Sequence, residues 1–198
     1  MVDTSAVPRF AAPLSPLPGI TSRLLTIADA ALLQRFLDDN PAYFIAVHGA
    51  APKPGEALNE LTSAPPVSYR YSDINLIGFL NRAGALVAYA NLVTDLFATG
   101  VWLIGTFYVA TEHHGRGVAP ALFNAIENWA AQNGADWLRL GVVIGNTRAQ
   151  RFWTRVGFTI VGVRAGVVMG ARTNALQVIV KALRGGTLDD YRALVAHD

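Results

Sequence analysis

The residues best suited to chemistry form a glycine-containing turn between an apolar run and an amphipathic one. The turn reads His113-His114-Gly115-Arg116-Gly117-Val118-Ala119 and follows the apolar run Val101–Val109. Glycines at a strand-to-helix corner let the backbone approach a ligand, and the first N–H groups of a helix have no partner inside the helix. Those donors and the positive end of the helix dipole suit phosphate oxygens. The turn therefore predicts an anion site, with a plain tight turn as the alternative.

The turn differs from two well-known phosphate-binding loops. No Gly-Lys-Ser or Gly-Lys-Thr follows it, as a nucleoside-triphosphate loop requires, and it lacks the Gly-x-Gly-x-x-Gly dinucleotide fingerprint. Pro120 fits the first turn of the following helix but removes one backbone donor. The chemistry is therefore neither that of a typical ATPase nor that of a typical dehydrogenase.

A second segment, further along the sequence, narrows the interpretation of the turn. It contains Asn146, Ala149, Phe152, Trp153, Gly157 and Phe158. Together, the two segments resemble the GNAT superfamily of acyl-CoA-dependent N-acyltransferases. That family's turn reads Gln/Arg-x-x-Gly-x-Gly/Ala, which here is His114 to Ala119 with histidine in the first place. Its later segment reads Asn-x-x-Ala-x-x-Phe-Tyr-x-x-x-Gly-Phe. The resemblance covers residues 21–183 and implies an N-acetyltransferase.

The resemblance also implies a binding slot for acetyl-CoA or coenzyme A as co-substrate. Two parallel strands, Val101–Val109 and Trp137–Ile144, would part at their C-terminal ends. An acetyl group would then pass to a primary amine, of a small molecule or a peptide, by direct attack without a covalent enzyme intermediate. The residues expected to hold the cofactor are the backbone of Phe107, Tyr108 and Val109 for pantetheine, the turn residues His114, Gly115, Arg116, Gly117, Val118 and Ala119 for pyrophosphate, and Asn146 for the pantetheine amides.

The chain departs from the family pattern at two catalytic positions, the general acid and the general base. Trp153 stands where the family has its tyrosine acid, and an indole N–H donates a hydrogen bond but does not ionise near neutral pH. Packing is the alternative role for Trp153. The run Leu96–Thr111 contains no carboxylate, so Glu112, just beyond it, is the candidate base. Further candidates are His113, His114, Asp73 and Asp95.

Three functions remain open at this point. The first is the acetyltransferase, and the second is a catalytically weak or inactive acyl-CoA-binding module of the same fold, which Trp153 motivates. The third is a phosphate binder unrelated to CoA. Three arginines, Arg148, Arg151 and Arg155, share one helical face and either contact the CoA 3′-phosphate or face solvent. Tyr43 and Phe44 either wall the acceptor pocket or belong to the core.

The elements that must position these residues follow from the hydrophobic pattern. Three apolar runs, Ile74–Leu80, Ala85–Leu96 and Val101–Val109, are separated by turn residues and predict an antiparallel meander. Helix and strand patterns then alternate as far as Gly157, and two more strands are expected over Phe158–Met169 and Asn174–Val180. Strands joined by a helical crossover are normally parallel and right-handed, so the second half of the sheet is expected to be partly parallel. A further helix is expected over Ala28–Asn40. We therefore expect an α/β fold with a mixed sheet of about seven strands, an antiparallel first half, a splayed parallel pair and helices on both faces.

Composition narrows the classes of protein. Of the 198 residues, 52% are hydrophobic and 15% charged, enough for a folded core. A net charge of +2 argues against a nucleic-acid partner. The longest uncharged run, Leu96–Thr111, is too short and too glycine-rich for a membrane span. The absence of cysteine fits a cytoplasmic protein. The sequence contains no group of metal-ligating residues at the spacing of a metal site, so we expect no metal.

The chain ends are expected to lie outside the catalytic domain. Residues 1–20 are rich in proline and predict an extended tail that clips onto the domain or onto a neighbouring molecule. In residues 184–198, Thr187 to Asp190 resembles a helix cap, so residues 188–196 are expected to form a helix. Leu188, Tyr191 and Leu194 would dock from that helix, and a homodimer contact is one use of this pattern.

Overall fold

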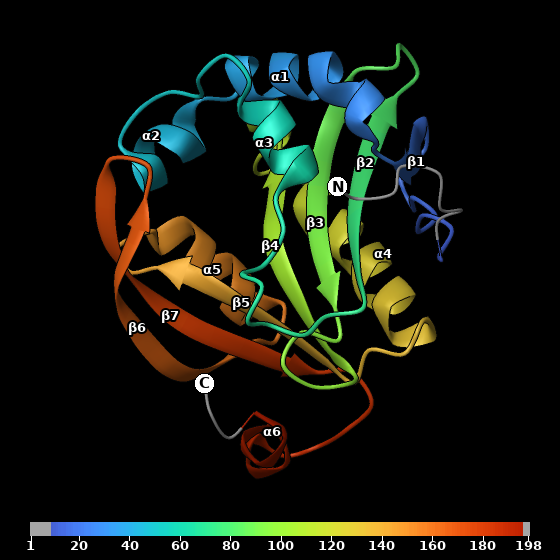
Figure 1. Ribbon diagram of the computed structural model, residues 1–198. Coiled ribbons are helices and arrows are strands. Elements are labelled where there is room, and N and C mark those ends of the chain that lie inside the picture. Colours follow the sequence, from blue (N-terminus) through green and yellow to red (C-terminus); the bar gives the residue numbers. More distant parts are fainter. Residues whose placement is uncertain (1–8, 196–198) are drawn as a thin grey trace.

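The computed structural model of the protein describes residues 9–195 and is built around one sheet of seven strands (Figure 1). The strands are β1 (Ile20–Leu24), β2 (Asp73–Asn81), β3 (Leu86–Thr94), β4 (Val101–Val109), β5 (Trp137–Val143), β6 (Thr159–Met169) and β7 (Arg172–Ala182). Their order across the sheet is β1-β2-β3-β4-β5-β7-β6. The pair β4–β5 is parallel, and all other neighbours are antiparallel. The predicted α/β class with a central parallel pair is confirmed.

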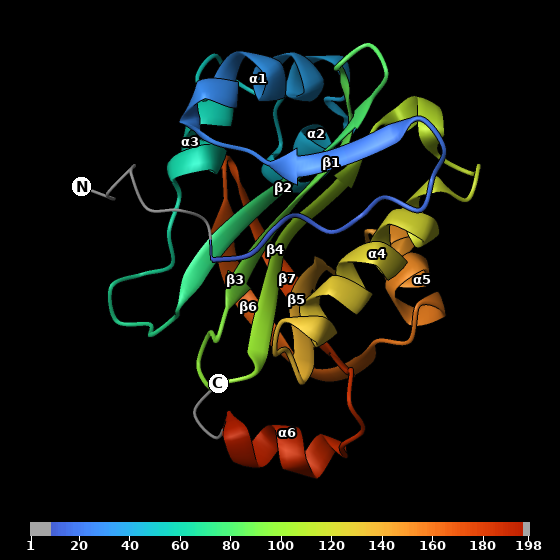
Figure 2. The same cartoon turned by 90° about the vertical axis from the view of Figure 1, so that its right-hand side faces the viewer.

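Helices cover both faces of this sheet. They are α1 (Ala30–Asp39), α2 (Ala42–His48), α3 (Glu56–Thr62), α4 (Val118–Gln132), α5 (Thr147–Arg155) and α6 (Leu188–Leu194), with short 3-10 helices at Ile27–Asp29 and Thr111–His113. Figure 2 shows α4 and α5 on one face, with α1 and α3 on the other. Because successive strand residues point to opposite faces, Leu76 packs in the core beneath α1, and its neighbour Ile77 packs in the core beneath α4.

Most of the predicted elements are present. The meander is formed as expected, and the Asn81–Gly84 turn closes with a bond from the Asn81 N–H to the Ala85 carbonyl of 2.9 Å. Two elements escaped prediction. Strand β1 has a polar centre, Thr21 to Arg23, which gives no apolar signal. Helix α2 begins directly after Pro41; proline usually ends a helix, as the predicted end of the preceding helix at Asn40 implies, but it also suits the start of one.

Both chain ends pack against the domain where they are described. At the N-terminal end, the Phe10 ring lies 5.7 Å from Trp102 and 5.8 Å from Trp129, and the Trp129 Nε1–H donates to the Ala11 carbonyl at 2.7 Å.

No helix within residues 9–195 is long and apolar enough to cross a membrane. The division of the chain at residues 20 and 183 stays a prediction.

The C-terminal helix is shorter than predicted and docks through fewer residues. Thr187 and Asp190 form the expected reciprocal cap of α6, and Tyr191 is buried against Trp137, with ring centroids 5.3 Å apart. Leu188 joins this small core. The expectation for Leu194 is wrong, because its side chain is 49% exposed at the end of the helix. The docking is within one chain, and the homodimer stays a prediction.

Candidate active site

The two parallel strands at the centre of the sheet part from each other. Strands β4 and β5 pair at only three positions, the last joining Leu103 to Arg139, and Figure 1 shows them diverging beyond that point. A β-bulge follows at once: Asn91 pairs with Thr106 and Leu92 with Ile104, which leaves Gly105 without a partner in β3. We call the place where the strands separate, at Leu103, Arg139 and Gly105, the fork.

Beyond the fork, one edge of β4 has no neighbouring strand among the described residues. The Ala110 N–H donates to the Val87 carbonyl at 2.8 Å. In an antiparallel pair, every second residue directs its backbone N–H and C=O at the partner strand, so the N–H and C=O of Tyr108 also point toward β3. The backbone groups of Phe107 and Val109 point the other way, toward the gap. Of the three residues predicted to meet pantetheine through the backbone, only Phe107 and Val109 therefore face the gap.

Tyr108 has a different task. Its side chain lies on the α1 face, where the hydroxyl donates to the Asn40 carbonyl and accepts from the Tyr43 N–H at 3.3 Å. Asn40 also accepts the Thr111 N–H at 2.7 Å through its side chain. These bonds tie the end of β4 to the end of α1 and fix the strand edge in place.

The glycine turn has the open backbone that its sequence predicted. Gly115 and Gly117 have φ of +74° and +77°, and a Cβ added to either would meet no atom within 4 Å. Gly117 immediately precedes α4, so the first N–H groups of this helix are directed at the space beside the turn. Arg116 is exposed, and Val118 and Ala119 are half-buried. An anion can approach this backbone without displacing a side chain of the turn.

His114 joins the turn to the free edge of β4. Its Nε2 lies 2.8 Å from the Val109 carbonyl, while its Nδ1 is buried with no partner within residues 9–195. Burial lowers the pKa of His114, against the opposing effect of the bond to Val109, and Arg148 lowers it further. The neutral ring therefore donates a hydrogen bond from Nε2 to the Val109 carbonyl and orders the turn. Because this carbonyl already accepts from His114, only the N–H of Val109 is available to a ligand.

Helix α5 borders the same gap. The Asn146 side chain caps it, accepting the Ala149 N–H at 3.2 Å, as predicted. Trp153 is buried among aromatic rings, 5.2 Å from Phe123 and 5.0 Å from Phe158. Its surroundings are those of a packing residue. The three arginines of this helix are exposed, and Arg148 lies within electrostatic reach of His114.

The carboxylates suggested by sequence lie away from the fork or are already engaged. Glu112 is 77% exposed and lies 3.4 Å from His113 on the loop after β4. The Asp95 carboxylate accepts the Gly100 N–H at 2.8 Å in a turn, and Asp73 accepts its neighbour's N–H. No group of three or more potential metal ligands occurs in the described part of the chain.

A carboxylate that sequence reasoning missed lies beside the bulge. Glu60, on α3, is half-buried, and the Tyr89 hydroxyl lies 3.5 Å from its Oε2. Burial raises the pKa of Glu60, and so does Glu56, against hydrogen bonds from Tyr89 and Thr106. Burial beside Glu60 also raises the pKa of Tyr43 to about 12. The nearby tyrosines thus stay protonated at neutral pH, and Glu60 is the acidic group among them.

The signal for Glu60 was present in the sequence. Glu56 and Glu60 are four residues apart on a short helix, where like charges repel.

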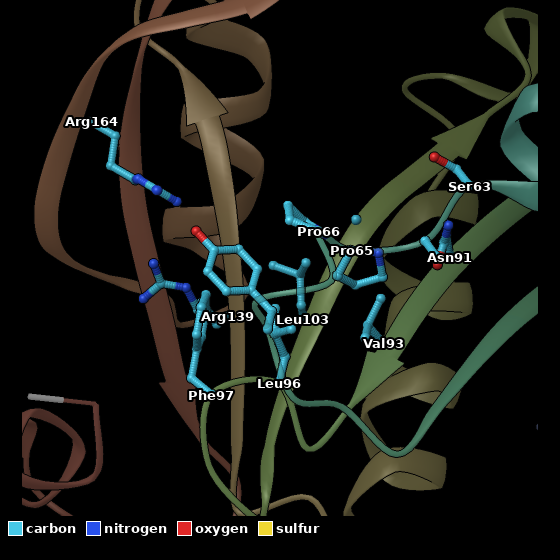
Figure 3. Close-up of a pocket in the computed structure, with 13 residues that line it drawn as sticks. Ser63, Pro65, Pro66, Asn91, Val93, Leu96, Phe97, Leu103, Arg139 and Arg164 are labelled. Carbon is cyan, nitrogen blue, oxygen red and sulfur yellow. The ribbon is translucent and has the colours of Figure 1, made fainter. Parts of the chain in front are cut away.

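A pocket opens at the fork on the same face as α3. It has a volume of about 250 Å³. Three of its residues, Leu103, Gly105 and Arg139, form the fork itself, and Asn91 lies across from the bulge (Figure 3). The segment after α3, from Ser63 to Pro66, covers it. The pocket therefore borders the gap between β4 and β5 on the face of the sheet opposite α4.

A second pocket, of about 410 Å³, lies between α2 and the β6–β7 turn. Phe44 lines it, whereas Tyr43 packs on Tyr108 at 5.2 Å. None of its lining residues belongs to β4 or β5. It is therefore separate from the fork.

Comparison with known proteins agrees with this geometry. An open mixed sheet, with a parallel pair parting beside a glycine turn, is the GNAT fold. The profile described as the Acetyltransferase (GNAT) family matches residues 56–158, more than half of the chain. The chain belongs to this family.

Relatives and solved structures are similar over different lengths. Uncharacterized N-acetyltransferases of Mycobacterium bovis and Mycobacterium tuberculosis are each 38% identical over 80 residues, 40% of this chain and 51% of theirs. The chain spans about half the length of these curated relatives. An acetyltransferase from Thermus thermophilus has a TM-score of 0.64 at 20% identity, over 85% of this chain and 99% of that one.

A structure with ligands is similar to the same degree. Spermidine N-acetyltransferase from Vibrio cholerae, in complex with CoA and spermine, has a TM-score of 0.63 at 17% identity, over 84% of this chain and 97% of that one. At such identities, the similarity shows the shared fold.

Proposed function

We propose that the protein is an acetyl-CoA-dependent N-acetyltransferase that acts on a primary amine. The observation that carries the proposal is the fork: a free strand edge, an open glycine turn and a capped helix border one gap. The resemblance in sequence and the CoA-bound Vibrio cholerae structure of the same fold support it.

The chain's residues fit coenzyme A in three places. The carbonyl of Phe107 and the N–H of Val109 are available for the pantetheine arm, which would lie along β4 as an added strand. The turn from His114 to Ala119 offers its N–H groups to the pyrophosphate, with Gly115 and Gly117 leaving the approach open. Asn146 closes the slot from α5, and Arg148 is the arginine best placed for a phosphate.

The transfer needs an oxyanion donor and a proton acceptor. The free N–H of Phe107 would face the carbonyl oxygen as charge develops on it. Bound acetyl-CoA supplies the acyl thioester, so the C–N bond forms as the C–S bond breaks and the bonding pair leaves with sulfur. Glu60 would take the proton that the amine nitrogen loses, and water would protonate the sulfur, since Trp153 does not ionise.

An inactive acyl-CoA-binding module is the second candidate, favoured by the burial of Trp153 among aromatic rings. Thiol release from acetyl-CoA with a panel of amines separates the two. Turnover with any amine supports the enzyme, whereas CoA binding without turnover supports the module.

The binding slot itself is tested by calorimetry with coenzyme A. We expect Gly117→Ala to weaken binding at least about tenfold, because its Cβ would enter the path of the pyrophosphate. Gly84→Ala is the matched control, since Gly84 has φ of +78° and equally open surroundings in the distant β2–β3 turn. No binding of coenzyme A by the unaltered protein, or equal effects of both substitutions, would contradict the proposal.

A further inference from the structure

The pocket at the fork is chemically different at its two ends. Asn91 lies at one end, beside the bulge, and Arg139 and Arg164 lie at the other, as Figure 3 shows. Apolar side chains fill the middle, including Pro65, Pro66, Val93, Leu96 and Leu103. A ligand that fits must be polar at both ends and apolar between them.

The Asn91 end suits a hydrogen-bond donor next to the acyl group. The Asn91 side-chain amide makes no hydrogen bond within residues 9–195, and its Oδ1 is buried. A Cβ on Gly105 would lie 3.7 Å from the Asn91 Cγ, and Asn91 pairs with Thr106, the neighbour of Glu60. A buried acceptor without a partner is costly, and an amine nitrogen would satisfy it.

The opposite end suits an anion. Arg139 is 3% exposed, donates to the Tyr191 hydroxyl and has its guanidinium 5.2 Å from the centre of the Phe97 ring. Arg164 points at the pocket from β6, next to a register shift in that strand, and has no carboxylate or hydrogen-bond partner in the described part of the chain. No acidic side chain is among the lining residues.

We infer that the acceptor is an amine that also carries a carboxylate. Its nitrogen binds between Asn91 and Glu60, and its carboxylate binds Arg164 at the opposite end of the pocket. A guanidinium pairs with a carboxylate through parallel N–H donors. A polyamine would instead bring a second cation against Arg164. This inference rests on the proposed function and adds the class of acceptor to it.

The test compares acceptors that differ only in the carboxylate. Phenylalanine is set against phenethylamine, and 6-aminohexanoate against pentylamine, with spermidine as the polycation; the readout is kcat/KM from thiol release. We expect the better amino acid to exceed its matched amine by about tenfold, the factor for one charge-assisted hydrogen bond that solvent partly screens. Arg164→Gln should reduce this ratio to near one. Arg35→Gln, an exposed arginine on α1, should leave it unchanged.

Each contrary outcome identifies what has failed. Preference for spermidine or for the plain amines overturns the carboxylate inference and leaves the acetyltransferase intact. A ratio that Arg164→Gln does not change does the same. If coenzyme A binds but no amine is turned over, calorimetry compares N-acetylphenylalanine with N-phenethylacetamide on the CoA-loaded protein, and equal or absent binding overturns the inference. Absence of coenzyme A binding overturns the proposed function and this inference with it.

Discussion

Glu60, the proposed proton acceptor, lies in surroundings that lower the stability of the folded protein. Burial raises its pKa, so the carboxylate ionises less readily in the folded chain than in the unfolded one. Below the pKa of the unfolded chain, Glu60 is protonated in both states and costs nothing. As pH rises through the range between the unfolded and folded pKa values, the unfolded state loses its proton first and stability falls. At neutral pH, the folded protein therefore carries this cost.

We predict that Glu60→Gln separates activity from stability. The substitution should lower kcat at least about 100-fold, a usual contribution of a general base. It should also raise the free energy of unfolding at neutral pH, and this gain should vanish below about pH 4, where an ordinary glutamate is protonated as well. Urea unfolding at the two pH values and thiol release measure these effects. Glu112→Gln should change neither, and a loss of activity there instead would favour the base suggested by sequence.

Among the helices and strands, the sequence predicted those whose local apolar pattern is strong. Strand β4 was correctly located because its apolar run is long, and the helix expected after the glycine turn is present as α4. The fork followed from the family resemblance, but its bulge at Gly105 depends on register between strands, which no local pattern encodes. Glu60 escaped because α3 is short, and its approach to Thr106 is a tertiary contact. The pocket combines residues from five separate segments, which the sequence alone does not bring together.

The N-terminal segment provides a prediction at this scale. Phe10 packs on Trp102 and Trp129, which belong to β4 and α4, so this segment supports the two elements that border the gap. Phe10→Ala should lower the free energy of unfolding by about 2 kcal/mol, less than for a fully buried phenylalanine because the ring is half-buried. Leu14→Ala is the control: its side chain is 90% exposed, and we expect a change within about 0.5 kcal/mol. Denaturant unfolding monitored by tryptophan fluorescence compares the two, and equal effects would show that the packing of Phe10 adds nothing.

The whole molecule consists of two sheet halves joined by a short junction. The sheet order makes β4–β5 the link between β1–β4 and β5–β7, and that link has three residue pairs. A shared core compensates for it: Ile77 and Phe79 from one half lie in the same cluster as Leu138 and Ile179 from the other. Because the apolar core crosses the junction beneath α4 and α5, the halves should unfold together.

We therefore predict one cooperative unfolding transition that coenzyme A shifts as a unit. With free coenzyme A at 100 times its Kd, the free energy of unfolding should rise by about 2.7 kcal/mol if only the folded state binds. The four tryptophans report on both halves, since Trp102 lies in β4 and Trp137 in β5, and far-ultraviolet circular dichroism reports on the backbone. Coincident curves from both probes, displaced equally by the ligand, are the expected result. Two separate transitions, with coenzyme A shifting only one of them, would contradict this prediction. They would mean that the three β4–β5 residue pairs and the shared core do not couple the two halves of the sheet, and that coenzyme A binds to one half alone.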